Sequence, residues 1–289
     1  MKKYLIIIFL ISCQSLLFSQ NPPVKEKEVD AILDDLFMED DVLNELMASL
    51  YNYQFLYVSV NYNSNTYFSG REIGLDQFNL SPQISYVHSK GFFASLSGTY
   101  YNEFIPSWDV TSVTAGYGHN IRSGNFRYYL AYSKYFYEND LVNLYTNSIG
   151  SGLSVGNKKR TLGTQLSAYY LFGEEQSIQV SLSSYGSIPI INSRNNRLKL
   201  RPQLSIITGK QTIELARITV QDDLIMTDYV ENEIFDLINI QFNIPLQYSS
   251  KAFDVELGYN INFPNAIGDE TDLKNTGFFN LRLAYLIDL

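Results

Sequence analysis

Cysteine, histidine and tryptophan are almost absent from this chain of 289 residues, which contains one Cys, one Trp and two His. The single cysteine, Cys13, excludes an internal disulfide, and it lies in an N-terminal segment that we expect to be removed. The mature chain would then have no thiolate nucleophile and no cysteine-based zinc site, and two separated histidines disfavour any other zinc site. We therefore predict neither a metal nor a cofactor.

Charged residues are also scarce, at 18% of the chain, whereas soluble domains have about 25%. Aromatic residues are abundant instead, since 23 Tyr and 18 Phe bring the aromatic share to 15%. Tyrosine has an apolar ring and a polar hydroxyl, a combination that suits the boundary between lipid and water. The composition therefore indicates a folded protein that meets a membrane interface.

Residues 1–20 have the features of a secretory signal peptide. Two lysines at positions 2 and 3 precede an apolar run that extends to Phe18, and polar residues follow. The run is shorter than the about 20 apolar residues that span a bilayer. We predict cleavage near Ser19 or Gln20. The alternative is a lipobox at 10–13, in which Cys13 would be lipidated and would begin the mature chain.

Removal of this segment takes away two lysines and no acid, which changes the net charge from −9 to −11. A chain this acidic repels nucleic acid, so we expect no nucleic-acid partner. No later stretch approaches about 18 consecutive apolar residues, so no transmembrane helix is expected. An exported chain of this kind is periplasmic, secreted, or a β-barrel in an outer membrane.

Strict alternation of apolar and polar residues decides among these alternatives. It runs through 238–249, 253–263 and 279–289, where apolar side chains occupy nearly every second position. Strands of soluble sheets are usually about five or six residues long, and these segments are about twice that length. Tilted strands of this length, with aromatic residues near their ends, cross the apolar layer of a membrane. The predicted fold is an all-β, antiparallel, up-and-down transmembrane β-barrel, with lipid outside and a polar lumen inside.

The same period predicts about twelve strands. We place them at 54–63, 78–88, 92–101, 110–121, 125–136, 145–156, 161–172, 177–188, 198–213, 236–249, 252–263 and 278–289. An even number puts both chain ends in the periplasm, with short turns there and longer loops outside. The even number requires that 214–235 form one long external loop and that 190–197 form a periplasmic turn.

This layout resembles the outer-membrane β-barrel proteins of Gram-negative, Bacteroidota-like bacteria, in particular the small-barrel type whose signal peptides end in a Phe-Ser-Gln-like sequence. The resemblance covers residues 52–289 and rests on the strand period and on the C-terminal strand at 278–289. It implies an outer-membrane location in contact with lipid, and it includes no catalytic motif. Such barrels commonly end in Phe, whereas this chain ends in Leu289.

Residues 21–51 form an acidic region before the barrel. Apolar residues recur at helical spacing within 24–50, opposite a series of Asp and Glu, which predicts one or two amphipathic helices. We interpret this periplasmic helical extension either as a cap on the barrel or as a docking element for a periplasmic or outer-membrane protein. In the second case the docking residues are Ile32, Leu33, Leu36, Leu43 and Leu46.

The two histidines, His88 and His119, have the parity of lipid-facing residues and lie beside predicted periplasmic turns. Outer-membrane lipid hydrolases resemble one another in using a His with a Ser at the outer rim. Both histidines are at the wrong end for that chemistry. We therefore predict that they anchor the barrel at the interface and that the protein is not an enzyme, with a lipid hydrolase as the disfavoured alternative.

Glycines line one wall of the predicted lumen. Gly150 and Gly152 of the sixth strand have the same inward parity as Gly116 and Gly118 of the fourth. The sequence therefore predicts a bare wall, whose space has to be filled by bulk from elsewhere.

Charged residues at lumen-facing positions are the candidate functional site. They are Arg127, Lys199, Arg201, Asp254, Glu256 and Arg282, with Asp288 near the periplasmic rim. Opposite charges in a confined space pair, which predicts a polar network that closes a narrow barrel. The alternative is a constriction that selects small solutes or ions. We therefore expect an outer-membrane barrel with a structural or partner-binding role, or else a porin-like passive diffusion channel.

Overall fold

The computed structural model describes residues 54–289, apart from short gaps at 68–69, 72–75, 104–106, 122–125, 139–144, 158–159, 194–195, 222–223, 251 and 267–272. For 120–121 and 211–234 it describes the backbone alone. The predicted signal peptide, the acidic extension and its docking residues lie outside the described residues. Within the described ranges, no helix has the length and hydropathy needed to cross a bilayer.

One antiparallel sheet of 15 strands makes up the described part of the chain. The strands are β1 (Gln54–Asn63), β2 (Asn79–His88), β3 (Phe92–Tyr101), β4 (Trp108–Ile121), β5 (Phe126–Tyr137), β6 (Tyr145–Gly156), β7 (Leu162–Gly173), β8 (Gln176–Gly186), β9 (Ile188–Asn192), β10 (Asn196–Leu200), β11 (Gln203–Gln221), β12 (Leu224–Asn243), β13 (Leu246–Ser250), β14 (Phe253–Pro264) and β15 (Thr276–Asp288).

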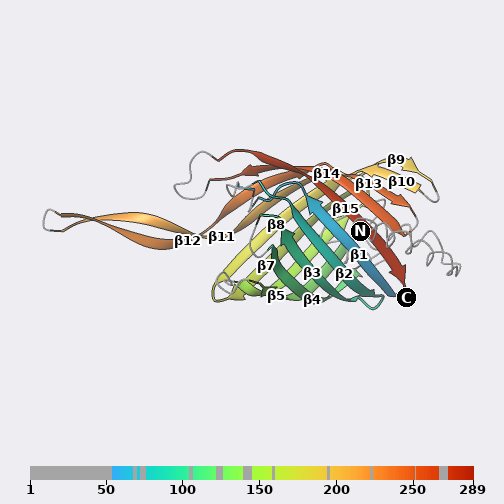
Figure 1. The fold of residues 1–289 in the computed structure, drawn as a ribbon, viewed down its shortest axis with the longest axis horizontal. Coiled ribbons are helices and arrows are strands. Elements are labelled where there is room, and N and C mark those ends of the chain that lie inside the picture. Colours follow the sequence, from blue (N-terminus) through green and yellow to red (C-terminus); the bar gives the residue numbers. More distant parts are fainter. Residues whose placement is uncertain are drawn as a thin grey trace, which may run out of the picture.

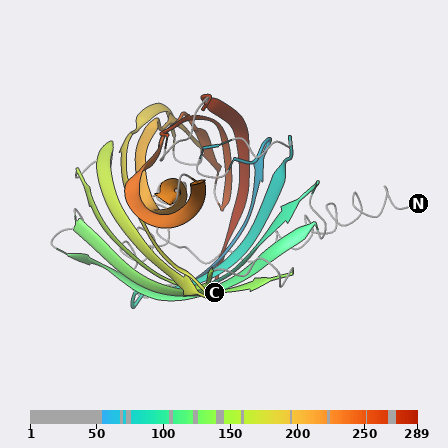
Figure 2. The same cartoon turned by 90° about the vertical axis from the view of Figure 1, so that its left-hand side faces the viewer.

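The sheet closes on itself as a barrel of twelve strands (Figure 1). Each strand from β1 to β7 pairs with the next one in the chain, and the ring continues from β8 to β11, β12, β14 and β15. The pairing of β15 with β1, from Phe55 opposite Asp288 to Asn63 opposite Asn280, completes it. Figure 2 views this ring along the barrel. The predicted all-β, antiparallel barrel of about twelve strands is therefore confirmed.

Two predicted strands are each interrupted by a proline. The segment at 198–213 divides at Pro202 into β10 and β11, and the segment at 236–249 divides at Pro245 into β12 and β13. Proline has no backbone N–H to donate to a ladder. Beyond these breaks, β13, β10 and β9 extend the sheet from β14 at the end of the barrel where the chain terminates. The predictions of two unbroken strands, and of a turn over the whole of 190–197, are therefore wrong.

The prediction of one long external loop at 214–235 is also wrong. β11 and β12 stay paired from Gly209 opposite Asp236 to Gln221 opposite Leu224. The neighbouring strands stop earlier, because β8 reaches only Gly209 and β14 pairs with β12 only from Asn239 onwards. The two strands therefore leave the barrel as a two-stranded ribbon, seen at the left of Figure 1. The barrel still has an even number of strands, because the ribbon is an extension of β11 and β12.

Burial in the barrel is inverted relative to a soluble β-sandwich, whose inner faces are apolar. Large apolar side chains point outward, and Leu130 and Leu257 are 58% and 53% exposed. Polar side chains such as Asp254, Gln247 and Asn262 face inward and are each only 1% exposed. This distribution confirms the predicted assignment of the polar face to the lumen.

Candidate functional site

Four cavities follow one another along the lumen, and neighbouring cavities share wall residues. The ribbon-end cavity, of about 310 Å³, is lined mainly by Asn side chains and adjoins a middle cavity of about 340 Å³ lined by Ser and Gln. Gln179 and Gln241 line both. The middle cavity shares Gln203 and Gln241 with a constriction of about 90 Å³. Arg201 then lines both the constriction and a basic cavity of about 260 Å³.

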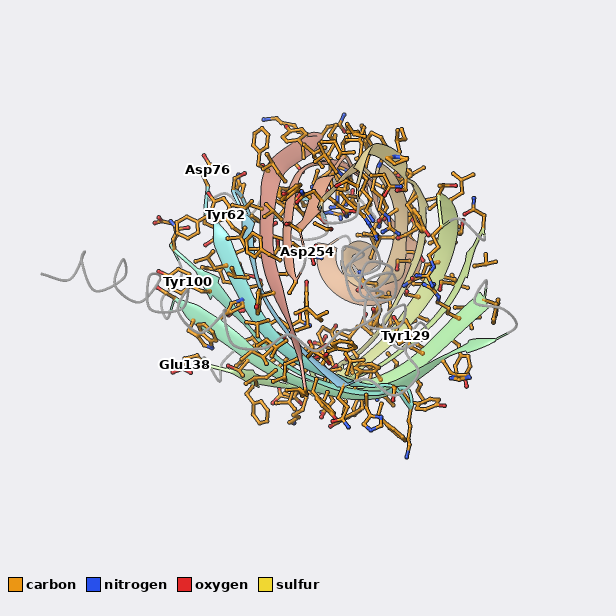
Figure 3. All side chains as sticks on the ribbon, turned by 90° about the vertical axis from the view of Figure 1, so that its right-hand side faces the viewer. Tyr62, Asp76, Tyr100, Tyr129, Glu138 and Asp254 are labelled. Carbon is orange, nitrogen blue, oxygen red and sulfur yellow. The ribbon has the colours of Figure 1, made fainter. Side chains whose placement is uncertain are left out.

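Strand register places most of the predicted charged residues beside the constriction. Lys199 on β10 lies opposite Gln247 on β13, and Gln247 lies opposite Glu256 on β14. Glu256 in turn lies opposite Arg282 on β15. Asp254 is two residues from Glu256 on the same inward face of β14, and Figure 3 shows Asp254 inside the ring of strands. Five of the six predicted residues therefore share one region: Lys199, Arg201, Asp254, Glu256 and Arg282.

Arg127 is the exception among the six. It is 4% exposed and lies on β5, opposite Asn120 of β4 and Ser154 of β6. These strands form a different part of the wall, so Arg127 does not join the charged row. Asp288 is exposed at the rim, as predicted.

The Glu256 carboxylate accepts hydrogen bonds from two amides. Gln247 Nε2 donates to one carboxylate oxygen and Asn280 Nδ2 to the other, each at 3.0 Å. Asn260 Nδ2 then donates to Asn280 Oδ1, also at 3.0 Å. A buried charge is tolerated when hydrogen bonds replace its lost hydration. These amides therefore hold a negative group in the wall of the constriction.

Gly258 makes room for this arrangement. A Cβ atom added to it would overlap Asn280 Oδ1 and would lie 3.0 Å from Asn243 Oδ1. The absence of a side chain at this position is thus what allows the amides to pack over β14.

A second chain of amides, which was not among the predicted site residues, lines the ribbon-end cavity. Asn239 Nδ2 and Gln241 Nε2 each donate to Asn262 Oδ1 at 3.1 Å, and Asn262 Nδ2 donates to Thr276 Oγ1 at 3.1 Å. The available indication was that amides occupy inward positions on β12 and β14, which are neighbouring strands. The lumen is therefore lined by neutral polar groups as well as by charges.

Gly70 and Arg71, in the connection between β1 and β2, lie against this wall. Thr276 Oγ1 donates to the carbonyl of Gly70 at 2.9 Å, and Arg71 donates to the carbonyls of Asn265 and Ile238 at 2.7 and 3.4 Å. Gly70 has a φ of 81°, and a Cβ atom there would lie 2.7 Å from the Asn239 side chain. Part of this connection therefore narrows the ribbon end of the lumen.

Aromatic rings cover the part of the lumen wall formed by Gly150 and Gly152, which was predicted to be bare. Tyr129 lies opposite Gly152 and Tyr169 lies opposite Gly150, and a Cβ atom on either glycine would meet the facing ring. The two hydroxyls lie 3.0 Å apart. Aromatic side chains that pack flat over a cross-strand glycine are a known means of stabilising curved sheets. The side chains that fill the space beside the glycines therefore come from the neighbouring strands β5 and β7. The middle cavity lies next to them and is lined in part by Tyr169.

Arg201 is held by a ring at the boundary between the constriction and the basic cavity. Its guanidinium carbon lies 3.9 Å from the centroid of the Tyr185 ring, a cation–π contact. Its side chain is 3% exposed. A cation is thereby fixed where two cavities meet.

The two histidines lie on the outer face at the end that carries the C-terminus. His88 Nδ1 accepts a hydrogen bond from the backbone of Lys90 at 3.0 Å, which closes the turn after β2. The His119 ring stacks on Tyr117 with centroids 6.5 Å apart. Their predicted placement, next to turns and facing away from the lumen, agrees with this geometry.

No protein-family model and no curated protein matches the sequence. Among solved structures, the chain is similar to the KdgM porin, with a TM-score of 0.46, 10% identity and coverage of 80% of this chain and 98% of the porin. An outer membrane channel from Pseudomonas putida F1 has a TM-score of 0.45 and 10% identity, with coverage of 82% of this chain and 97% of the channel. LpxR from Salmonella typhimurium has a TM-score of 0.44 and 10% identity, with coverage of 80% of this chain and 99% of LpxR. Because these scores are below 0.5, the fold is assigned from the strand pairing of this chain.

Proposed function

We propose that the protein is an outer-membrane barrel that conducts small polar solutes through its lumen. The outer face supports the location. Phe253 and Phe263, at the two ends of β14, are 43% and 41% exposed and ten residues apart. At about 3.3 Å per residue and a tilt of about 40°, they lie about 25 Å apart along the membrane normal. This is the height of the apolar band in outer-membrane barrels.

Aromatic clusters at both ends of the outer face also support a membrane location. Phe78 lies between Tyr62 and Tyr100, with ring centroids 5.7 and 6.4 Å away, at the ribbon end. Phe92 and Tyr117 are 5.2 Å apart at the opposite end. Girdles of this kind lie at the two lipid–water boundaries.

The series of polar cavities with shared wall residues is the observation that carries the proposed conduction. Solutes would pass neutral amide and hydroxyl groups before they reach Arg201, Glu256 and Arg282 at the constriction. A ring with both signs of charge and a small cross-section selects by size and charge. The expected activity is therefore passive diffusion of small polar solutes.

A closed barrel with a structural or partner-binding role is the second candidate. The hydrogen-bonded carboxylate of Glu256 and the buried Lys199, Arg201 and Asp254 favour it, because such a network can rigidify a wall without passing solute. In that case the acidic extension at 21–51 would supply the docking surface. Deletion of 21–51 should then remove proteins that co-purify with the barrel, and an unchanged set of companions would contradict the docking hypothesis.

Planar-bilayer recording of the purified full chain tests the proposed conduction. We expect stepwise currents whose size rises with KCl concentration. Glu256→Gln should change the ratio of anion to cation permeability, whereas Lys134→Gln should not, because Lys134 lies between two lumen-facing residues, Ser133 and Tyr135, and so points outward. Absence of current at all voltages and salt concentrations would favour the closed barrel.

A further inference from the structure

The basic cavity lies at the end of the lumen that carries the C-terminus. Its volume is about 260 Å³, and the described residues that line it include four cations and several neutral polar side chains but no carboxylate. The cations are Arg160, Arg197, Lys199 and Arg201. A cavity with this lining is exceptional in a chain whose net charge is −9.

Three separate elements hold the cations in place. Arg197 and Lys199 occupy alternate positions of β10, and Lys199 is 8% exposed. Arg201 follows at the break before Pro202 and rests on the Tyr185 ring. Arg160 belongs to the turn between β6 and β7, where its φ of 52° is uncommon for a non-glycine residue.

The Arg160 turn is fixed by its own hydrogen bonds. The Arg160 backbone N–H donates to the carbonyl of Asn157 at 2.9 Å, and the Thr161 N–H donates to Asn157 Oδ1 at 2.8 Å. Both Arg160 and Thr161 line the basic cavity. The backbone at these two lining residues is therefore held in place by hydrogen bonds.

Guanidinium groups present planar pairs of N–H donors that match carboxylate and phosphate oxygens, and an ammonium adds a point charge. Several cations in a cleft with low-dielectric walls raise the local concentration of anions. We infer that the basic cavity binds a small dissolved oxyanion, a carboxylate or a phosphate, and makes the lumen anion-selective. The selectivity rests on the proposed channel function, whereas the binding does not.

Two acidic groups on the neighbouring wall oppose this binding. Glu256 accepts its two amide hydrogen bonds in the constriction. Asp254 lies opposite Ser249, which lies opposite Arg197, so the acid and this cation are two strands apart. At about 4.8 Å per strand, the Cα atoms of the two residues are about 10 Å apart. Removal of the Asp254 charge is therefore expected to strengthen anion binding.

Calorimetric titration of the purified barrel with inorganic phosphate tests the binding. We expect Arg197→Gln and Lys199→Gln each to weaken phosphate binding about tenfold, the effect of losing one hydrogen bond to a charged group. Lys199→Arg should restore binding, Asp254→Asn should tighten it, and Lys134→Gln should leave it unchanged. Equal affinities in the wild type and all variants, or no phosphate binding, would overturn the inference.

A lipid headgroup presents the same phosphate chemistry, so the titration is repeated with phosphatidylglycerol in the detergent micelles. The location of the cavity on the lumen face predicts no change in phosphate affinity. Competition by the lipid would assign the site to a headgroup and would overturn the inference of a dissolved ligand.

Reversal potentials in a KCl gradient test the selectivity. We expect the wild type to prefer chloride and Arg197→Gln/Lys199→Gln to lose this preference. Phosphate binding without any current would refute the channel and leave the anion site standing. Current whose selectivity does not respond to these substitutions, together with absent phosphate binding, would refute the anion site and leave the channel standing.

Discussion

Substitution of Gly152 by alanine tests the packing of the lumen wall. A Cβ atom at Gly152 would overlap Cε1 of Tyr129, whose side chain is 7% exposed. To avoid the overlap the ring has to swing away from β6 and give up its contact with the Tyr169 hydroxyl at 3.0 Å. The lost hydrogen bond costs about 1 kcal/mol, and overpacking typically costs about 1–3 kcal/mol. We expect Gly152→Ala to lower the free energy of unfolding by about 2 kcal/mol.

Gly156 provides a matched control on the same face of the same strand. A Cβ atom there would lie 3.5 Å from the carbonyl oxygen of Leu162 and 3.7 Å from the Tyr185 hydroxyl, which are ordinary contacts. Gly156→Ala should therefore range from no change to about 1 kcal/mol of stabilisation, because alanine restricts the unfolded chain.

Urea unfolding in detergent, followed by circular dichroism, measures both effects. A double-mutant cycle with Tyr129→Ala isolates the contribution of the ring, and in that background Gly152→Ala should cost less than about 0.5 kcal/mol. Equal unfolding midpoints for Gly152→Ala and Gly156→Ala would refute the reasoning. So would a cost of Gly152→Ala that persists when the ring is absent.

Three further changes have expected outcomes. Glu256→Gln removes the carboxylate at the constriction and should raise the chloride-to-potassium permeability ratio roughly twofold in bilayer recordings; an unchanged or lower ratio would contradict the placement of this charge on the solute path. Arg71→Ala removes the hydrogen bonds to the carbonyls of Ile238 and Asn265, and a hydrogen bond from a charged donor contributes about 1.5–3 kcal/mol. Limited proteolysis should then cleave the chain within 64–71 faster, while the thermal unfolding temperature of the barrel stays the same. Replacement of 212–233 by a two-residue turn removes only pairing outside the barrel, so unfolding and conductance should be unchanged, and failure to fold would show that the ribbon is part of the cooperative unit.

The strand period was sufficient to predict the barrel, because each inward or outward choice repeats over ten or more residues. The apolar positions of 253–263 and 279–289 fall on the lipid-facing side of β14 and β15 as expected. The same period could not locate the breaks at Pro202 and Pro245, since the alternation continues across both. It also could not separate a loop from a paired ribbon at 214–235, because the period within one segment does not reveal which segment it pairs with.

The candidate site was predicted only as far as single positions allow. Parity identified Lys199, Arg201, Glu256 and Arg282 as lumen-facing, and register then placed them in neighbouring positions. The amide contacts of Glu256 and the aromatic cover over the glycines were missed for a common reason. Both depend on which residue lies opposite which across a strand pair, and a single sequence leaves that register open by two residues in either direction.

The ribbon of β11 and β12 extends far beyond the end of the barrel. From Gly209, where β8 stops pairing, to Gln221 the strand advances twelve residues, or about 40 Å at about 3.3 Å per residue. A bilayer with its headgroups is about 40–45 Å thick. The last described pair of the ribbon, Gln221 and Leu224, is therefore separated from the barrel by nearly the thickness of the membrane, and a partner bound there would be held well clear of the lipid.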